Sequence, residues 1–342
     1  MTATAPIKQD RAAEQTRPRR RLPAWFGPWE IALLGLVIIA LVYGSLSSPF
    51  FATGPNFAIT TTGAMSLALM VVPMTMLMIA GEIDLSVASV FGLAGVVFGM
   101  TLNAGVPLVL ALLIGLVLGA LAGFVNGWLT TRFGLPSLVV TIGTLGLYRG
   151  IAYILLENRS ISSIPDGWAS FAQNAVPGTY IPYALILFAV IAALAALILH
   201  RGAFGRRIFA VGSSPTVSRY SGIRVVAMKR SLFALSGAIA ALAGMLYSGY
   251  VASARADNGT GLELATIAIV LIGGVSMFGG RGSFVGVILA LILVTALTSL
   301  MNLAFVPTNI QNTVVGLLMI GAVVVPAIVT RVRLRAGRPS KS

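Results

Sequence analysis

The feature that most constrains this chain is a succession of apolar segments, each about twenty residues long. An α-helix rises 1.5 Å per residue, so about 20 apolar residues are needed to cross the ~30 Å hydrocarbon core of a bilayer. The sequence therefore predicts an all-α polytopic membrane protein with about ten transmembrane helices. These segments are residues 30–50, 57–79, 84–102, 107–129, 135–156, 181–199, 231–252, 263–280, 284–304 and 309–330.

Composition supports this class of protein. Of the 342 residues, 57% are hydrophobic and only 9% are charged, whereas a soluble domain of this size needs a more charged surface. The chain has no cysteine and a single histidine, which excludes disulfides and argues against His- or Cys-based metal sites. We predict no cofactor and no metal.

The basic residues predict the orientation in the membrane. Most of the Lys and Arg residues lie before Trp25, between residues 200 and 230, and after Thr330. Short basic loops stay on the cytoplasmic side beside anionic lipid, so this clustering indicates membrane lipid and not nucleic acid as the partner. A transmembrane domain over 30–330 is then flanked by cytoplasmic tails, 1–29 and 331–342, and the segments 157–180 and 251–264 lie outside.

The basic loop 200–230 contains seven basic residues and no acid. Its centre has turn and cap residues up to Pro215, followed by a segment, Thr216–Ser221, that is long enough for one or two helical turns. From the residues alone, a solvated loop is the simpler interpretation. The outside segment 157–180 contains Pro165, Trp168 and Phe171, which suggest a short interfacial helix with aromatic anchors.

Few charged residues lie near the apolar segments. Asp84 and Ser86 either cap the third helix, with negative charge at its positive dipole end, or line a pathway together with Glu82 at a broken helix. Arg149 lies about 12 Å inside a helix end. Its side chain either snorkels to the membrane interface, or lines a pathway or pairs two helices. Close helix packing is predicted where Gly115, Gly119 and Gly123 recur every four residues.

Three sequence blocks carry a resemblance: GEIDLSVASV (81–90), VGSSPTVSRYSGI (211–223) and IVLIGGVSMFGGRGSFVG (269–286), with TIGTLGLYRGIAYIL (141–155) as a weaker fourth. Together they resemble the permease family of bacterial ABC importers for monosaccharides, of the ribose, xylose, arabinose and rhamnose type. That family more often has a glycine where this chain has Glu82. The resemblance implies a type II ABC importer-like permease in the bacterial plasma membrane, which is a transport subunit and not an enzyme.

The resemblance also implies three protein partners. A second permease copy or a paralogue completes a dimer, an ABC ATPase subunit docks on the short helix after Pro215, and an extracytoplasmic sugar-binding protein delivers the ligand. None of the three lysines lies in a Walker A pattern, so ATP hydrolysis belongs to a separate subunit. By position, the ATPase-coupling residues are Gly212, Ser213, Ser214, Pro215, Ser218, Arg219, Ser221 and Gly222. The candidate binding-protein contacts are Asp166, Trp168, Arg255, Asp257 and Glu263.

The cargo is the least constrained expectation. The segment SARADNGTGLEL (253–264) is similar to segments in rhamnose permeases and, more loosely, in autoinducer-2 permeases, so rhamnose or a related sugar is expected. The alternatives are a permease for another small solute, such as autoinducer 2, a nucleoside or a branched-chain amino acid, and an ATPase-independent secondary transporter. A membrane enzyme is the weakest alternative, because the sequence offers no nucleophile with a general base beside it.

Overall fold

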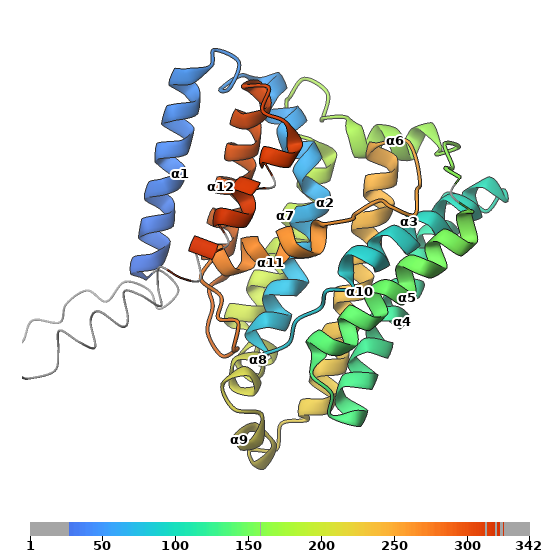
Figure 1. Ribbon diagram of the computed structural model, residues 1–342, viewed down its shortest axis with the longest axis vertical. Coiled ribbons are helices and arrows are strands. Elements are labelled where there is room, and N and C mark those ends of the chain that lie inside the picture. The colour runs from blue at the N-terminus through green and yellow to red at the C-terminus, as the bar shows by residue number, and fades with distance from the viewer. Residues whose placement is uncertain (1–26, 158, 312, 319, 322–323, 325–342) are drawn as a thin grey trace, which may run out of the picture.

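The computed structural model describes residues 27–157, 159–311, 313–318, 320–321 and 324, and their regular structure is helical (Figure 1). Outside the described residues lie the predicted basic tails, except residues 27–29. Much of the tenth predicted segment lies outside them too. The helices are α1 (Pro28–Ser47), α2 (Gly54–Ile79), α3 (Val87–Asn103), α4 (Leu108–Phe133), α5 (Ser137–Leu156), α6 (Asp166–Gln173), α7 (Tyr183–Arg201), α8 (Ala203–Ser213), α9 (Pro215–Tyr220), α10 (Val225–Tyr250), α11 (Leu262–Ile272) and α12 (Phe284–Leu303).

Seven of these helices are long and apolar enough to cross a membrane, namely α1, α2, α4, α5, α7, α10 and α12, while α3 and α11 are shorter apolar helices. Each of the first nine predicted segments therefore contains an apolar helix. The expectation of an all-α polytopic membrane protein is confirmed.

Two predicted boundaries are wrong. The segment 263–280 is helical only to Ile272, because the backbone at Gly274 adopts a φ of +84° that a helix cannot continue. The resulting eleven-residue helix α11 is only about 16 Å long. The next error is at α10, which begins at Val225 and not at 231, so that Lys229 and Arg230 lie in its first two turns.

Two long helices form the centre of the molecule. Most of α2 and α10 is buried, whereas α1, α4, α5 and α7 leave most of their surface exposed. The central helix α10 packs against α4, α3 and α2, and α1 packs against α12 at one side of the molecule (Figure 1). The exposed outer helices present the apolar surface that a membrane protein offers to lipid or to another membrane subunit.

The predicted glycine face of α4 packs against α10. A Cβ placed on Gly119 would lie 2.5 Å from the Cβ of Ala241, and a Cβ on Gly127 would lie 2.9 Å from the Cα of Arg230. Such distances leave no room for a side chain. The prediction of close packing along Gly115, Gly119 and Gly123 is confirmed, and the partner is the central helix.

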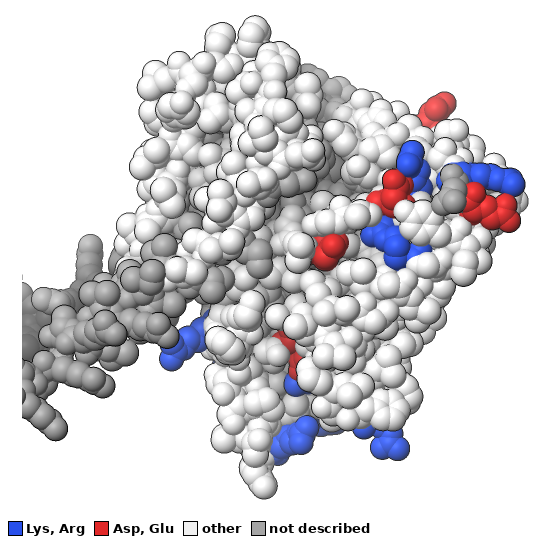
Figure 2. Space-filling view, in the orientation of Figure 1, with Lys and Arg blue, Asp and Glu red and all other residues white. Residues whose placement is uncertain are grey.

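The charged residues separate into two regions at opposite ends of the molecule. Figure 2 shows mainly Lys and Arg at the end that carries α8 and α9, and residues of both signs near the far end of α5. We call these the basic end and the mixed-charge end. The basic loop 200–230 is largely helical, since it contains α8, α9 and the start of α10, so the simpler interpretation as a solvated loop is wrong.

Candidate functional site

The helix α9 lies at the basic end and contains three of the eight predicted coupling residues, Pro215, Ser218 and Arg219, while the other five directly precede or follow it. Ser214 is its N-cap, and the Ser214 hydroxyl accepts a hydrogen bond from the backbone N–H of Val217 at 3.3 Å. At the other end, the backbone N–H of Ile223 donates to Ser218 O at 3.0 Å and that of Gly222 to Arg219 O at 3.0 Å. This pair of bonds is a Schellman motif, which requires the left-handed backbone of Gly222, whose φ is +80°. The six-residue helix is therefore capped by hydrogen bonds at both ends.

Two apolar side chains of α9 are exposed, and sequence reasoning missed both. Val217 is 63% and Tyr220 is 90% exposed. They are three residues apart and lie on one face of the helix. Exposed aromatic and aliphatic side chains on one face are typical of a protein interface. In contrast, Ser218, a predicted coupling residue, is buried and faces the protein. The signal in the sequence was the spacing of Val217 and Tyr220 within an otherwise polar helix.

Glycines join the end of α8 to two other segments. A Cβ on Gly212 would lie 2.5 Å from the backbone nitrogen of Gly280, and a Cβ on Gly279 would lie 2.8 Å from the Cα of Gly81. The N–H of Gly280 also donates to Ile79 O, the last residue of α2, at 2.8 Å. We call Gly81, Gly212, Gly279 and Gly280 the glycine junction. It connects the three sequence blocks at 81–90, 211–223 and 269–286, and it places predicted coupling residues directly against the end of α2.

Glu82 forms an ion pair with Lys229 of α10. The Glu82 side chain is 7% exposed and that of Lys229 is 18% exposed, so the pair is largely buried. Both residues line a cleft of about 660 Å³ at the basic end, which Thr131 and Arg219 also line. The acid therefore neutralises a lysine of α10 within this cleft. The hypothesis that Glu82 lines a pathway fits its place in this cleft.

One prediction is that the side chains of Asp84 and Ser86 cap α3. The structure shows no such cap. Ser86 is the N-cap residue of α3, but its hydroxyl accepts no bond from the helix backbone. Instead, Asp84 Oδ1 accepts from the Ser86 N–H at 3.0 Å and the Ser86 hydroxyl at 2.6 Å, and Oδ2 accepts from the Ser236 hydroxyl at 3.0 Å. Asn126 Nδ2 donates to the Ser86 hydroxyl at 2.7 Å.

All four of these side chains are buried, so Asp84 and Ser86 line no open pathway in this conformation. Their network ties the start of α3 to α4 and α10. Together with the Glu82 ion pair, it fastens the segment 80–86 to α10 at Lys229 and at Ser236, two helical turns apart. A carboxylate with three donors is satisfied without a cation.

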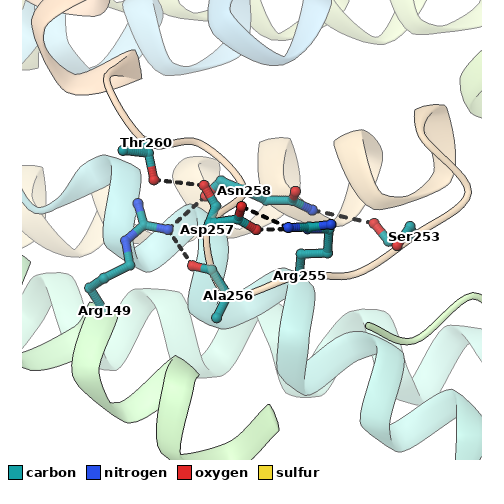
Figure 3. Close-up of polar contacts among 7 residues, drawn as sticks. All are labelled: Arg149, Ser253, Arg255, Ala256, Asp257, Asn258 and Thr260. Atoms are coloured by element: carbon teal, nitrogen blue, oxygen red, sulfur yellow. Dashed lines mark hydrogen bonds and ion pairs between the residues drawn. The ribbon is translucent and has the colours of Figure 1, made fainter. Parts of the chain in front are cut away.

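The Arg149 side chain is bonded to backbone atoms of the protein. Its guanidinium donates to three backbone carbonyls, those of Ala256, of Asn258 at 2.8 Å, and of Ala88 at 3.0 Å. Figure 3 shows the side chain reaching from α5 to the loop between α10 and α11. A Cβ on Gly92 of α3 would lie 2.7 Å from Arg149 Nη1, so this glycine makes room for the contact. The helix-pairing alternative is confirmed in part, with a loop and α3 as the partners.

The loop held by Arg149 is also bonded to itself and to the other outside segment. Arg255 and Asp257 form a bidentate ion pair at 2.8 and 3.0 Å (Figure 3), and these hydrogen bonds from Arg255 hold the pKa of the Asp257 carboxyl below its usual range. The backbone of Ala254 exchanges hydrogen bonds of 2.8 and 3.0 Å with Ile161. The two predicted outside segments therefore form one surface at the mixed-charge end.

One candidate binding-protein contact is wrong. Trp168 lies on α6, as expected for a short helix in this segment, but the side chain is buried, and its indole N–H donates to Met245 O on α10 at 2.9 Å. The predicted aromatic anchor thus fixes α6 to α10. Asp166, Arg255 and Asp257 are exposed and Glu263 is half-buried, so these four remain accessible to a partner.

Comparisons with known proteins identify the family of the chain. The family described as branched-chain amino acid transport system / permease component matches residues 56–323. The autoinducer 2 import system permease protein LsrD of Salmonella typhi is 34% identical over 302 residues, covering 86% of this chain and 90% of that protein. LsrD of Enterobacter sp. (strain 638) is 33% identical over 298 residues, covering 85% and 90%. LsrD of Escherichia coli (strain K12) is 33% identical over 302 residues, covering 86% and 91%. No solved structure matches the chain significantly.

Proposed function

The chain belongs to the family of branched-chain amino acid transport system permease components, and from this premise we propose that it carries a small sugar-like solute as the membrane-spanning subunit of an ABC importer. It is a multi-pass protein of the bacterial inner membrane. The observation that carries the proposal is the similarity to LsrD proteins over 85% or more of the chain. The cargo named for these relatives makes autoinducer 2 the first solute to test, and the segment 253–264 keeps rhamnose as the second.

The proposed ATPase contact is the exposed face of α9. Val217 and Tyr220 are exposed there, and α9 is joined to α8, whose end lies in the glycine junction against α2. We infer that closure of the ATPase subunits moves α8 and α9 as one body. The junction passes that motion to α2 and to the segment 273–283, because a contact without side chains has little freedom to absorb a displacement.

The proposed dimer contact involves α5. A Cβ placed on Gly143, Gly146 or Gly150 meets no atom within 4 Å, so these glycines face away from the rest of the chain. A helix with small residues on its exposed face allows another membrane helix to approach closely. This supports a second permease copy or a paralogue on that side. The proposed contacts for the extracytoplasmic binding protein are Asp166, Arg255, Asp257 and Glu263 at the mixed-charge end.

Transport in proteoliposomes tests the cargo. The permease would be reconstituted with its ATPase and binding protein, and uptake of labelled autoinducer 2, rhamnose and leucine would be measured with and without ATP. We expect ATP-dependent uptake of autoinducer 2 or rhamnose and no uptake of leucine. Uptake of leucine alone would contradict the cargo class, and accumulation by the permease alone without ATP would contradict the ABC mechanism.

Co-purification tests the ATPase contact. We expect Tyr220→Ala to weaken binding of the ATPase about 30-fold, since truncating a central aromatic anchor of an interface costs about 2 kcal/mol or more. Thr216→Ala, on the same helix and also exposed, is the matched control and should leave binding within about twofold. If the two variants bound the ATPase equally well, α9 would not be part of the interface.

A further inference from the structure

A second cavity lies at the basic end, and its lining combines arginines with apolar side chains. It measures about 860 Å³ and lies where α9 leads into α10, beside α4. Three arginines line it: Arg219 of α9, Arg224 immediately before α10, and Arg230 in the second turn of α10. Phe124 of α4 and Val226 and Ala227 of α10 supply an apolar wall.

The arginines of this cavity have no acidic partner among the described residues. Among all the described residues, the ion pairs are those of Arg159, Lys229 and Arg255. Arg230 donates from Nε to the Thr131 hydroxyl at 2.8 Å, which leaves the two terminal nitrogens of its guanidinium available. Three guanidinium groups around one cavity repel each other, so the site is complementary to an anion.

The position of the cavity restricts which anion it fits. With 26 residues, α10 is about 39 Å long and exceeds the ~30 Å hydrocarbon core by about 9 Å. Basic residues favour the headgroup level, so they place this excess at the start of α10, with Arg224 immediately before the helix and Arg230 in its second turn. Phe124 lies nine residues before the end of α4, about 14 Å deeper along the helix, and is 43% exposed.

We propose that this cavity is a binding site for one anionic phospholipid, with the phosphodiester headgroup between Arg219, Arg224 and Arg230 and an acyl chain against Phe124, Val226 and Ala227. Guanidinium groups bind phosphate oxygens in a bidentate manner, and the adjoining apolar wall matches a hydrocarbon chain, which a free phosphate ion lacks. The bound lipid bridges α9 to α10. Arg219 then contributes to lipid binding, while Val217 and Tyr220 on the same helix remain for the ATPase.

Lipid titration of the purified full-length permease tests this site. Native mass spectrometry would count the phosphatidylglycerol and phosphatidylcholine molecules retained by the wild type and by the double variant Arg224→Gln/Arg230→Gln. The wild type should retain one phosphatidylglycerol in preference to phosphatidylcholine. The double variant should bind phosphatidylglycerol at least about tenfold more weakly, since each basic residue near an anionic lipid surface contributes appreciably to binding.

The matched control is Arg206→Gln/Arg207→Gln, which removes two exposed arginines of α8 at the same end that do not line the cavity. It should retain the lipid within about twofold of the wild type. Equal losses in the two double variants would show a diffuse basic surface and overturn the proposal. If loss of the Arg230 bond to Thr131 prevents folding, Arg224→Gln alone is used and should weaken binding severalfold, and wild-type affinity in that variant would overturn the proposal.

Two further arms identify the source of the anion. Inorganic phosphate and water-soluble glycerophosphoglycerol, at concentrations up to 100 times that of the lipid, should not displace phosphatidylglycerol, because they lack the acyl chain. Displacement by either would show an anion site without lipid specificity. Loss of the lipid on addition of the ATPase subunit would show that a protein surface covers the arginines, and this result would also overturn the proposal.

Discussion

At the scale of single residues, the ion pair between Glu82 and Lys229 is a contact in which the loss of one partner is costly. Both side chains are largely buried, and Glu82 has a side-chain exposure of 7%. Removing one partner of a buried pair leaves the other charge without compensation, which costs about 3 to 5 kcal/mol. Removing both charges costs much less, because nothing charged remains to be buried.

We therefore predict that Lys229→Met lowers the free energy of unfolding by about 3 to 5 kcal/mol and that Glu82→Gln/Lys229→Met regains most of this loss. Denaturation in mixed micelles measures both values. The exposed pair of Arg159 and Glu157 offers the control, since Arg159→Met should change stability by less than about 1 kcal/mol. Additive effects of the two substitutions in the buried pair would show that the contact contributes no coupling.

At the scale of elements, Arg149 determines how firmly the loop between α10 and α11 is held. The planar guanidinium reaches three carbonyls on two elements, which a lysine ammonium cannot do with the same geometry. We predict that Arg149→Lys increases hydrogen exchange of residues 254–260 about tenfold or more. Arg132→Lys, at the exposed end of α4, should not change exchange in this loop. Unchanged exchange in Arg149→Lys would mean that the loop holds its shape unaided.

The same loop should respond to acid through Asp257. Its pKa in the folded state is lowered by the hydrogen bonds from Arg255, below the ordinary value of about 3.9. The stabilisation is therefore fully present above about pH 5 and is lost as the pH falls through the folded-state pKa. After correction for the intrinsic rate, exchange of residues 253–260 should be constant from about pH 7 to pH 5 and rise in stronger acid.

The variant Asp257→Asn checks the assignment of this pH response. It cannot form the charged pair, so its exchange should already be raised at neutral pH and should show no further rise from this group in acid. A rise in acid that is the same in the variant and the wild type would assign the response to another group.

At the scale of the whole molecule, the glycine junction connects segments that are far apart in the sequence. A side chain at Gly212 would meet the backbone of Gly280 and of Ile79, and backbone atoms cannot rotate away as a side chain can. We predict that Gly212→Ala lowers stability by about 1 to 3 kcal/mol through overpacking. It should also reduce ATP-dependent uptake, because the connection from α8 to α2 is displaced.

The control for this prediction is Gly35→Ala on α1, where an added Cβ meets no atom within 4 Å. It should be neutral or stabilising by up to about 1 kcal/mol, because alanine is the better helix former. Thermal unfolding of the two variants in detergent, followed by uptake assays in vesicles, separates the two outcomes. A Gly212→Ala protein with wild-type stability and uptake would show that the junction is not close-packed during transport.

Sequence reasoning predicted the features that depend on local patterns. The apolar lengths predicted nine described helices, and the cap and turn residues up to Pro215 indicated that one or two helical turns could follow, because these signals lie within a few positions of one another. It could not predict contacts between distant segments. Glu82 and Lys229 are 147 positions apart, and the sequence alone does not reveal that Trp168 faces the core, since an amphipathic helix near an interface has apolar neighbours on either side.

The short length of α11 has a mechanical consequence. The irregular segments at its two ends, 251–261 and 273–283, are only about 16 Å apart along the axis. A slide of one helical turn, about 5.4 Å, covers a third of that distance, whereas in a helix that crosses the full bilayer it covers less than a fifth. We expect a displacement that begins at Gly279 and Gly280 to reach the loop held by Arg149 through this one short helix, which covers only about half of the hydrocarbon core.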